Sequence, residues 1–279
     1  MTKYIEKNSQ QLFLMIVIVI IGAFLTIKSE YFLTPSNLIN IADSCGYRLI
    51  MAVGMTFIMA SGVMDLSAGS TVSLAGVITA WMLHAGAGIP LSVVAGLLTG
   101  VTAGALNGLL IHYTKISFFI ITLAMSGMLR GISLIITGGR PITRFGATFM
   151  TIGTGRLAGI QILAAAVILN CTKWGSYIKT LGSNPEALRK CGIGTAGYRI
   201  SVQAVMGLAA AITAVIITAR LNSAEPNAGM DMELDAITAV AMGGTPITGG
   251  KACISGTMLA VIILGIIRNA LTLMSISSD

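Results

Sequence analysis

The chain alternates long apolar segments with short polar connections, and this alternation predicts its secondary structure. About nine apolar segments run for roughly 15–22 residues, close to the ~20 residues with which a helix crosses a bilayer. Five of the six prolines lie between these segments, where they interrupt no helix. We therefore expect an all-α, polytopic helical membrane protein in which residues 1–279 form a single transmembrane domain. The expected spans are Leu12–Ile27, Cys45–Ser61, Thr71–Ala85, Leu91–Ile111, Ser117–Thr137, Gly159–Thr172, Ser201–Ala219, Leu234–Met242 with its glycine-rich extension, and Ile254–Leu273.

The composition agrees with a chain whose main solvent is lipid. Of its 279 residues 55% are hydrophobic and only 10% are charged, whereas soluble domains carry ~25% charged residues. The mean hydropathy is +0.89, so there is too little polar surface to cover a globule in water. The net charge of +7 comes from basic residues spread mostly singly at the ends of apolar segments. This distribution is typical of membrane proteins and argues against a nucleic-acid partner.

One long polar interruption, residues 173–200, separates the apolar segments in the second half of the chain. Five of the 17 basic residues lie in it, and a short helix with its own end signals is predicted near its centre. These signals are a capping side chain, a proline at the first helical position, an acid in the first turn, bases in the last turn and a terminating glycine. We expect the segment to lie in the cytoplasm and to present the helix to a partner protein. The helix and its ends comprise Asn184, Pro185, Glu186, Ala187, Arg189, Lys190 and Gly192.

The distribution of Lys and Arg predicts the orientation, because cytoplasmic connections carry more of them. The overall margin is small, and the dense cluster in residues 173–200 decides it, since one loop with five cations resists translocation. The N-terminus then lies in the cytoplasm. The first apolar run lacks a small-residue cleavage site, so we expect it to stay as an uncleaved span. On this topology four acids fall in one external loop: Glu225, Asp231, Glu233 and Asp235.

Glycines mark two further features. Every fourth residue from Gly96 to Gly108 is a glycine, and such a stripe favours close approach of another helix backbone in lipid. The stretches 62–69 and 243–250 share a glycine, aliphatic-hydroxyl, glycine pattern, although a chance match among 33 glycines is the competing interpretation. Two such breaks suggest discontinuous helices from a duplicated unit, and we expect their glycines to line the pathway or its gate. These glycines are Gly62, Gly69, Gly243, Gly244, Gly249 and Gly250.

Two charged residues fall where the pattern predicts membrane depth. Asp65 lies between two expected spans, and Arg130 lies inside the fifth one. An isolated charge at that depth costs about 2.5–3.5 kcal/mol, so each needs a partner, water or a position near the interface. Either Asp65 caps the following helix and Arg130 extends outward, or the two belong to a gate or pathway and pair with each other.

No motif for catalysis, metal binding or nucleotide binding is found. Residues 245–252 resemble a phosphate-binding loop, but Thr245 replaces its first glycine and Ala252 replaces the hydroxyl residue after the lysine. The four cysteines and two histidines have neither metal-ligand nor disulfide spacing. We therefore expect a transport subunit with no cofactor and no metal, and not an enzyme.

Residues 186–192 match the first half of a loop signature of ATP-driven importer permeases, E-A-A-x-x-x-G, with Leu188 in place of the second alanine. The second half of the signature is absent near Val202. Taken with four longer stretches, the chain resembles the permease subunits of bacterial ABC importers for ribose, xylose and related monosaccharides. These stretches are Ala52–Ser70, Leu181–Arg189, Ala219–Pro226 and Glu233–Lys251.

The resemblance implies a subunit that imports a monosaccharide such as ribose, driven by a separate cytosolic ATPase subunit. It also implies an extracytoplasmic sugar-binding protein, a second permease protomer, identical or different, and a multi-pass position in the bacterial inner membrane. On this account the predicted short helix couples to the ATPase, and the four external acids contact the binding protein. Import of a sugar-like signal such as autoinducer-2 stays open, because the binding protein selects the ligand.

Two departures from the family pattern favour other interpretations. Family members continue beyond Ser278 with one more spanning helix, so a truncated or structural membrane subunit without transport activity of its own is an alternative. The external region between Pro141 and Gly159 is also shorter than usual. An ion-coupled carrier or an ungated channel is a third class; such a carrier should hold several acids at membrane depth, and this sequence offers one or two.

Overall fold

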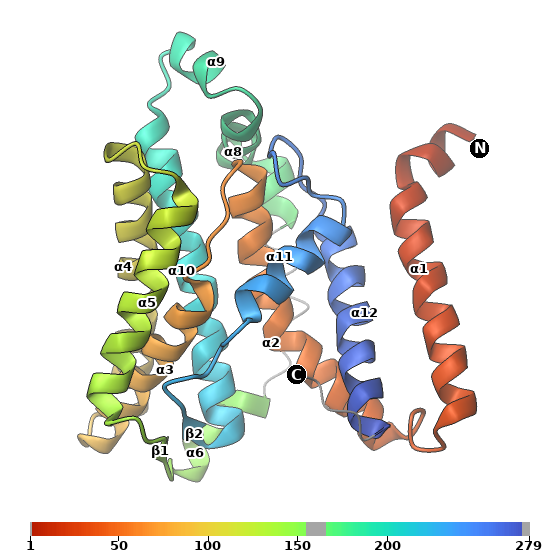
Figure 1. Cartoon of the computed structure of the whole chain (residues 1–279), viewed down its shortest axis with the longest axis vertical. Helices are drawn as coiled ribbons and strands as arrows, with labels where there is room; N and C mark the ends of the chain where they lie inside the picture. The colour runs from red at the N-terminus through yellow and green to blue at the C-terminus, as the bar shows by residue number, and fades with distance from the viewer. Residues whose placement is uncertain (1, 155–165, 275–279) are drawn as a thin grey trace.

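A computed structural model describes residues 2–154 and 166–274 of the chain. Helices dominate this part, and its one sheet is a pair of two-residue antiparallel strands, which confirms the predicted all-α class (Figure 1). The elements are α1 (Thr2–Lys28), α2 (Pro35–Ala60), α3 (Ala68–His84), α4 (Ile89–Tyr113), α5 (Phe118–Thr137), β1 (Ile142–Thr143), α6 (Ala147–Met150), the 3-10 helix η1 (Thr151–Thr154), α8 (Lys173–Ser183), α9 (Pro185–Lys190), α10 (Thr195–Leu221), β2 (Ser223–Ala224), α11 (Met232–Met242) and α12 (Ile254–Leu273).

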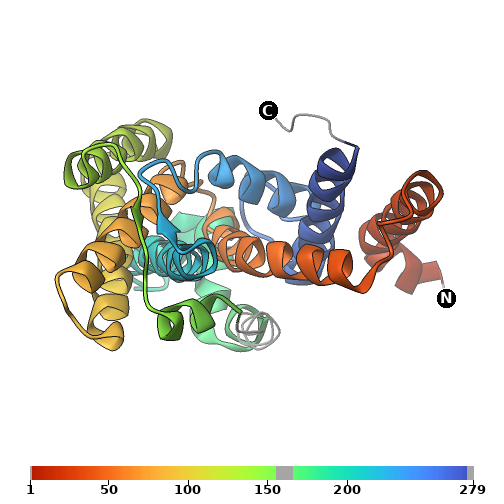
Figure 2. The ribbon, with the colours of Figure 1, turned by 90° about the horizontal axis from the view of Figure 1, so that it is seen from below.

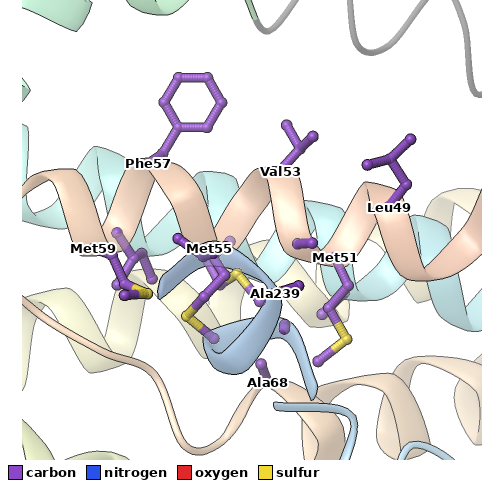
Figure 3. Close-up of a cluster of buried hydrophobic side chains, with 14 of the residues drawn as sticks. Leu49, Met51, Val53, Met55, Phe57, Met59, Ala68 and Ala239 are labelled. Carbon is purple, nitrogen blue, oxygen red and sulfur yellow. The ribbon is translucent and has the colours of Figure 1, made fainter. Parts of the chain in front are cut away.

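The centre of the bundle is the second half of α2. Every residue from Leu49 to Ala60 is buried, so this stretch is enclosed on all sides. A helix that is apolar all round belongs in the interior. Figure 3 shows one row of side chains pointing toward α11 and the start of α3, and a second row pointing to the opposite side of α2. The first row is Met51, Met55 and Met59, and the second is Leu49, Val53 and Phe57.

The predicted glycine stripe of α4 lies against α10 and α3. A Cβ atom added at Gly104 would meet the backbone carbonyl of Gln203, and one added at Gly100 would meet that of Gly207. At the end of the stripe, Gly96 faces Thr79 of α3. The helices can approach this closely only because glycine has no side chain, so the predicted packing role of the stripe is confirmed.

Two helices are shorter than a membrane is thick and begin inside the bundle. After α2, residues 61–67 turn back into the bundle, and α3 runs from mid-height to the lower end in Figure 1. After α10, which runs in the opposite direction, residues 225–231 turn back, and α11 rises obliquely near mid-height to the connection that leads to α12. The stretch that matches 61–67 by position is therefore the one before α11. The predicted match of 62–69 with 243–250 is wrong, because residues 243–250 follow α11 and connect it to α12.

Within the described residues, six helices are long and apolar enough to cross a membrane, so nine spans are not reproduced there. Of the expected spans, α3 has 17 residues and α11 has 11. Most of the expected span Gly159–Thr172 lies outside the described residues, and 166–171 are helical. At the edge of the bundle, α1 packs on α12 (Figure 2). The six candidate spans are Ser9–Lys28, Pro35–Ala60, Ile89–Tyr113, Phe118–Thr137, Thr195–Leu221 and Ile254–Leu273.

Candidate functional site

The predicted short helix is present as α9 at one end of the bundle (Figure 1). The side-chain oxygen of Asn184 accepts a hydrogen bond from the backbone N–H of Ala187 at 3.0 Å, and Pro185 occupies the first helical position. The helix ends before Gly192, whose φ of 74° lies in the left-handed region. This conformation is easily reached only by glycine, which explains the helix end.

One residue fixes α9 to the bundle. Leu188 is only 3% exposed, whereas Glu186, Arg189 and Lys190 are exposed around it. Leu188 is also the residue that departs from the importer signature. Its burial explains the departure, because the larger side chain anchors the helix while the charged residues stay free to contact a partner.

Glycines from two connections meet a glycine near the end of α8 and form what we call the glycine joint: Gly62, Gly182, Gly249 and Gly250. The backbone N–H of Gly250 donates to the carbonyl of Ala60, the last residue of α2, at 2.9 Å. A Cβ at Gly182, near the end of α8, would meet that same carbonyl and the nitrogen of Gly250. Three of the predicted pathway glycines therefore join the end of α8 to α2 and to the α11–α12 connection.

The two remaining glycines of this connection serve the turn between α11 and α12. Gly243 ends α11 and lies against the backbone of Thr257 in α12. Gly244 lies beside the side chain of Gln10 in α1, which donates to the carbonyl of Met242 at 2.9 Å. Both contacts hold helix ends together.

A cluster of mostly polar residues lies where the two half-length helices, α3 and α11, begin. We call it the half-helix junction, and it comprises Asp65, Ser67, Gly69, Asn107 and Glu233. Asp65 is only 1% exposed, and its Oδ1 accepts hydrogen bonds from the backbone N–H of Ser67 at 2.8 Å and from the Ser67 hydroxyl at 2.6 Å. The amide of Asn107 in α4 donates to the Ser67 hydroxyl oxygen at 2.7 Å. Asp65 lies before α3, but the N-cap of that helix is Ser67 and no side chain caps it, so the predicted alternative in which Asp65 caps the helix is wrong. The carboxylate instead accepts from the hydroxyl and the backbone N–H of Ser67.

Close contact between α3 and α11 shuts this junction. A Cβ at Gly69 would meet Oε2 of Glu233 and the carbonyl of Gly229. Oε2 of Glu233 is buried and has no hydrogen-bond partner. The Glu233 carboxylate lies within electrostatic range of Arg130, Asp65 and Asp231. The two half-length helices therefore meet through one glycine and one acid.

Arg130 does not pair with Asp65. None of the ion pairs in the described part of the chain joins these two residues. Instead, Nη1 of Arg130 lies 3.4 Å from Oδ1 of Asn227, in the stretch that precedes α11. The predicted alternative of a direct Asp65–Arg130 pair is wrong, because Asp65 already has neutral partners within its own turn and Arg130 extends across to α11.

The acids expected in one external loop are divided. Glu225 and Asp231 are exposed, Glu233 lies in the junction, and Asp235 lies in the first turn of α11. Both Asp235 oxygens accept from Nη2 of Arg268 at 2.6 Å, and Oδ2 also pairs with Arg48 at 3.2 Å.

Sequence reasoning missed this three-residue ion cluster. Arg48 lies in α2 and Arg268 lies in α12. Each of two long apolar helices contains one arginine, and a third helix carries an acid. This pattern is the sequence signal from which the ion cluster could have been predicted. Among the described residues, no group of three His, Cys, Asp or Glu is placed to hold a metal ion.

Comparison with known proteins gives this geometry a context. Residues 37–278 match the family model described as "branched-chain amino acid transport system / permease component". The chain belongs to this family. It is therefore a multi-pass transport component and not an enzyme. No solved structure matches the chain.

Three curated relatives are similar over most of their length. The ribose import permease protein of Haemophilus influenzae is 38% identical over 276 residues, covering 94% of this chain and 85% of the relative. That of Escherichia coli K12 is 37% identical over 277 residues, covering 95% and 86%. That of Bacillus subtilis is 35% identical over 278 residues, covering 96% and 84%.

Proposed function

We propose that the chain is the permease subunit of an ABC importer that brings a ribose-like monosaccharide into a bacterial cell. The named relatives are ribose import permeases, and their similarity extends over at least 94% of this chain. ATP hydrolysis belongs to a separate ATPase subunit, since the chain has no nucleotide-binding motif. The chain acts together with a second permease protomer and an extracytoplasmic sugar-binding protein.

The observation that carries this proposal is the geometry of α9. A six-residue helix with a capped start is anchored by one buried leucine and exposes three charged residues at the end of a membrane bundle. Such a helix contributes little to the core, so its exposed surface is available for another protein. We infer that α9 docks on the ATPase from the cytoplasm and that residues 173–200 form the coupling segment.

The glycine joint gives a route by which motion of α9 reaches the membrane. The short connection after α8 links α9 directly to the joint, and the joint contacts the end of α2 and the α11–α12 connection through backbone atoms. A push on α9 is therefore passed on as a shift of α11 relative to α3. We infer that this shift opens and closes the half-helix junction, which serves as the gate of the sugar pathway.

The remaining parts of the proposal follow from this orientation. The N-terminus lies in the cytoplasm, and α3, α11 and the segment 159–172 complete about nine crossings of the inner membrane. Glu225 and Asp231 contact the binding protein, because both are exposed and lie in the stretch between β2 and α11, and β2 is at the end of the bundle opposite to α9 (Figure 1). Glu233 lies in the half-helix junction and Asp235 is paired with two arginines, so the proposed binding-protein contact is limited to Glu225 and Asp231.

Charge reversal in α9 tests the proposed coupling. Glu186→Arg places a cation at the start of the exposed helix surface, and we expect recovery of the ATPase with the purified chain to fall at least tenfold, or about 1.4 kcal/mol. Glu225→Arg is the matched control, since it makes the same exchange at an exposed acid remote from α9. Equal ATPase recovery with Glu186→Arg and the wild type would contradict the assignment of α9.

A further inference from the structure

The half-helix junction holds more hydrogen-bond acceptors than donors. Oε2 of Glu233 and Oδ1 of Asn107 are both buried without a partner, and Asn107 is 0% exposed. Asp65 adds a buried carboxylate with no ion pair in the described part of the chain. A buried polar atom without a partner costs roughly 1–3 kcal/mol, so two of them at one place need an explanation.

The orientation of the Asn107 amide follows from its neighbours. The hydroxyl of Ser67 donates its single proton to Asp65, so its oxygen can only accept from the amide nitrogen of Asn107. The carbonyl oxygen of Asn107 then has no donor. It lies within the same hydrogen-bonded cluster as Asp65, at the start of α3. The missing groups are therefore donors, and more than one is needed.

The charges of the junction favour a neutral ligand over a bare cation. Two helix N-termini meet here, each equivalent to about +0.5 elementary charge, and Arg130 adds another positive charge. Together they amount to about +2, which balances the carboxylates of Asp65 and Glu233, while Asp231 is exposed and solvated. A cation would find little net attraction, whereas hydroxyl groups can donate to all three acceptors.

We propose that Asp65, Asn107 and Glu233 form a hydroxyl-binding station that a sugar occupies as it passes through the gate. The proposal rests on the proposed function and adds the site at which this subunit contacts its cargo. In the present conformation the close contact between Gly69 of α3 and the Glu233 carboxylate of α11 keeps the station closed. Movement of α11 away from α3 opens it and lets the sugar hydroxyls donate to the unpartnered oxygens of Asn107 and Glu233, and to the carboxylate of Asp65.

Uptake of D-ribose tests the station in proteoliposomes that contain the full chain, its ATPase and its binding protein. Glu233→Gln and Asn107→Leu each remove an acceptor, and we expect each to lower uptake about tenfold. ATP hydrolysis stimulated by the binding protein should stay within twofold of the wild type, since α9 and the glycine joint are unchanged. The matched control is Asp43→Asn, which changes a carboxylate that is 41% exposed and lies in α2 outside the junction. Glu233 is half-buried, so Glu233→Gln should assemble even if Asn107→Leu does not.

The outcomes separate the station from the function on which it rests. Normal uptake by both variants, or equal losses of uptake and ATP hydrolysis, would overturn the station alone. No D-ribose uptake by the wild type would overturn the proposed function and the station with it. Replacement of Na⁺ by choline should leave wild-type uptake unchanged, and a loss confined to Na⁺-free buffer would overturn the station in favour of a cation site.

Discussion

At the scale of single residues, the acids of the bundle are stabilised in three different ways. Asp65 accepts hydrogen bonds from neutral groups of its own turn, Asp235 is paired with two arginines, and Glu233 keeps one oxygen without a partner. A buried charge persists only when it is paired or hydrogen-bonded, and Asp65 and Asp235 both meet this condition within the fold. Glu233 is the exception, and this is why the gate is assigned to its surroundings.

The Asp235 ion cluster should contribute to stability. Asp235→Asn leaves Arg48 and Arg268 as two unneutralised cations on neighbouring helices, and we expect a loss of about 1–2 kcal/mol because the carboxylate is only 26% exposed. Thermal unfolding in detergent should show a midpoint several degrees lower. Asp43→Asn, whose carboxylate lies 4.0 Å from Arg220, should change the midpoint little. Equal midpoints for Asp235→Asn and the wild type would contradict a stabilising role of the cluster.

Interactions between residues close together in the chain could be predicted from the sequence, whereas interactions between residues far apart in the chain could not. The cap of α9 joins residues three positions apart, so its chemistry is visible in a short window. Asp235 and Arg48 are 187 residues apart in the chain, and nothing in either segment specifies the other. The partner of Arg130 was missed for the same reason, because the approach of residue 227 to α5 depends on how α10 and α11 pack.

At the scale of elements, long apolar segments were predictable and half-length helices were not. The expected spans Ser117–Thr137 and Ile254–Leu273 agree with α5 and α12 within one residue at either end. A helix that spans the membrane is predictable because its own sequence is a continuous apolar segment of about 20 residues. The starts of α3 and α11 inside the bundle are brought together in a contact between Gly69 and Glu233, two residues too distant in the chain for one window of sequence to contain both.

The glycine joint gives a prediction at this scale. In Gly182→Ala the new methyl group meets the backbone of α2 and of the α11–α12 connection, so α8 must move away from both. We expect the ATPase to co-purify and hydrolyse ATP as in the wild type, while D-ribose uptake in proteoliposomes falls at least fivefold. Gly197→Ala in α10 is the control, since a Cβ there has nothing within 4 Å. Full uptake by Gly182→Ala would rule out the joint as the route of coupling.

At the scale of the whole molecule, the bundle has two distinct ends. One end carries α9, the glycine joint and the α11–α12 connection, and the other carries the β1–β2 pair and the chain before α11 (Figure 1). The two half-length helices begin between these ends and run in opposite directions. Helices that begin inside a bundle in this way are found in transporters that work by alternating access, which agrees with the proposed function.

The proposed coupling of α9 to an ATPase requires that the end of the bundle that carries α9 faces the cytoplasm. Cys191 is exposed at the end of α9, and Glu225 is exposed in the chain that follows β2. Two variants test the orientation: one keeps Cys191 as its only cysteine, and the other has Glu225→Cys as its only cysteine. Both are expressed without the ATPase in spheroplasts and treated with a membrane-impermeant maleimide. We predict labelling of the Glu225→Cys variant in intact spheroplasts, and of Cys191 only after permeabilisation. Labelling of Cys191 in intact spheroplasts, with Glu225→Cys protected, would contradict the cytoplasmic position of α9 and the coupling to an ATPase that follows from it.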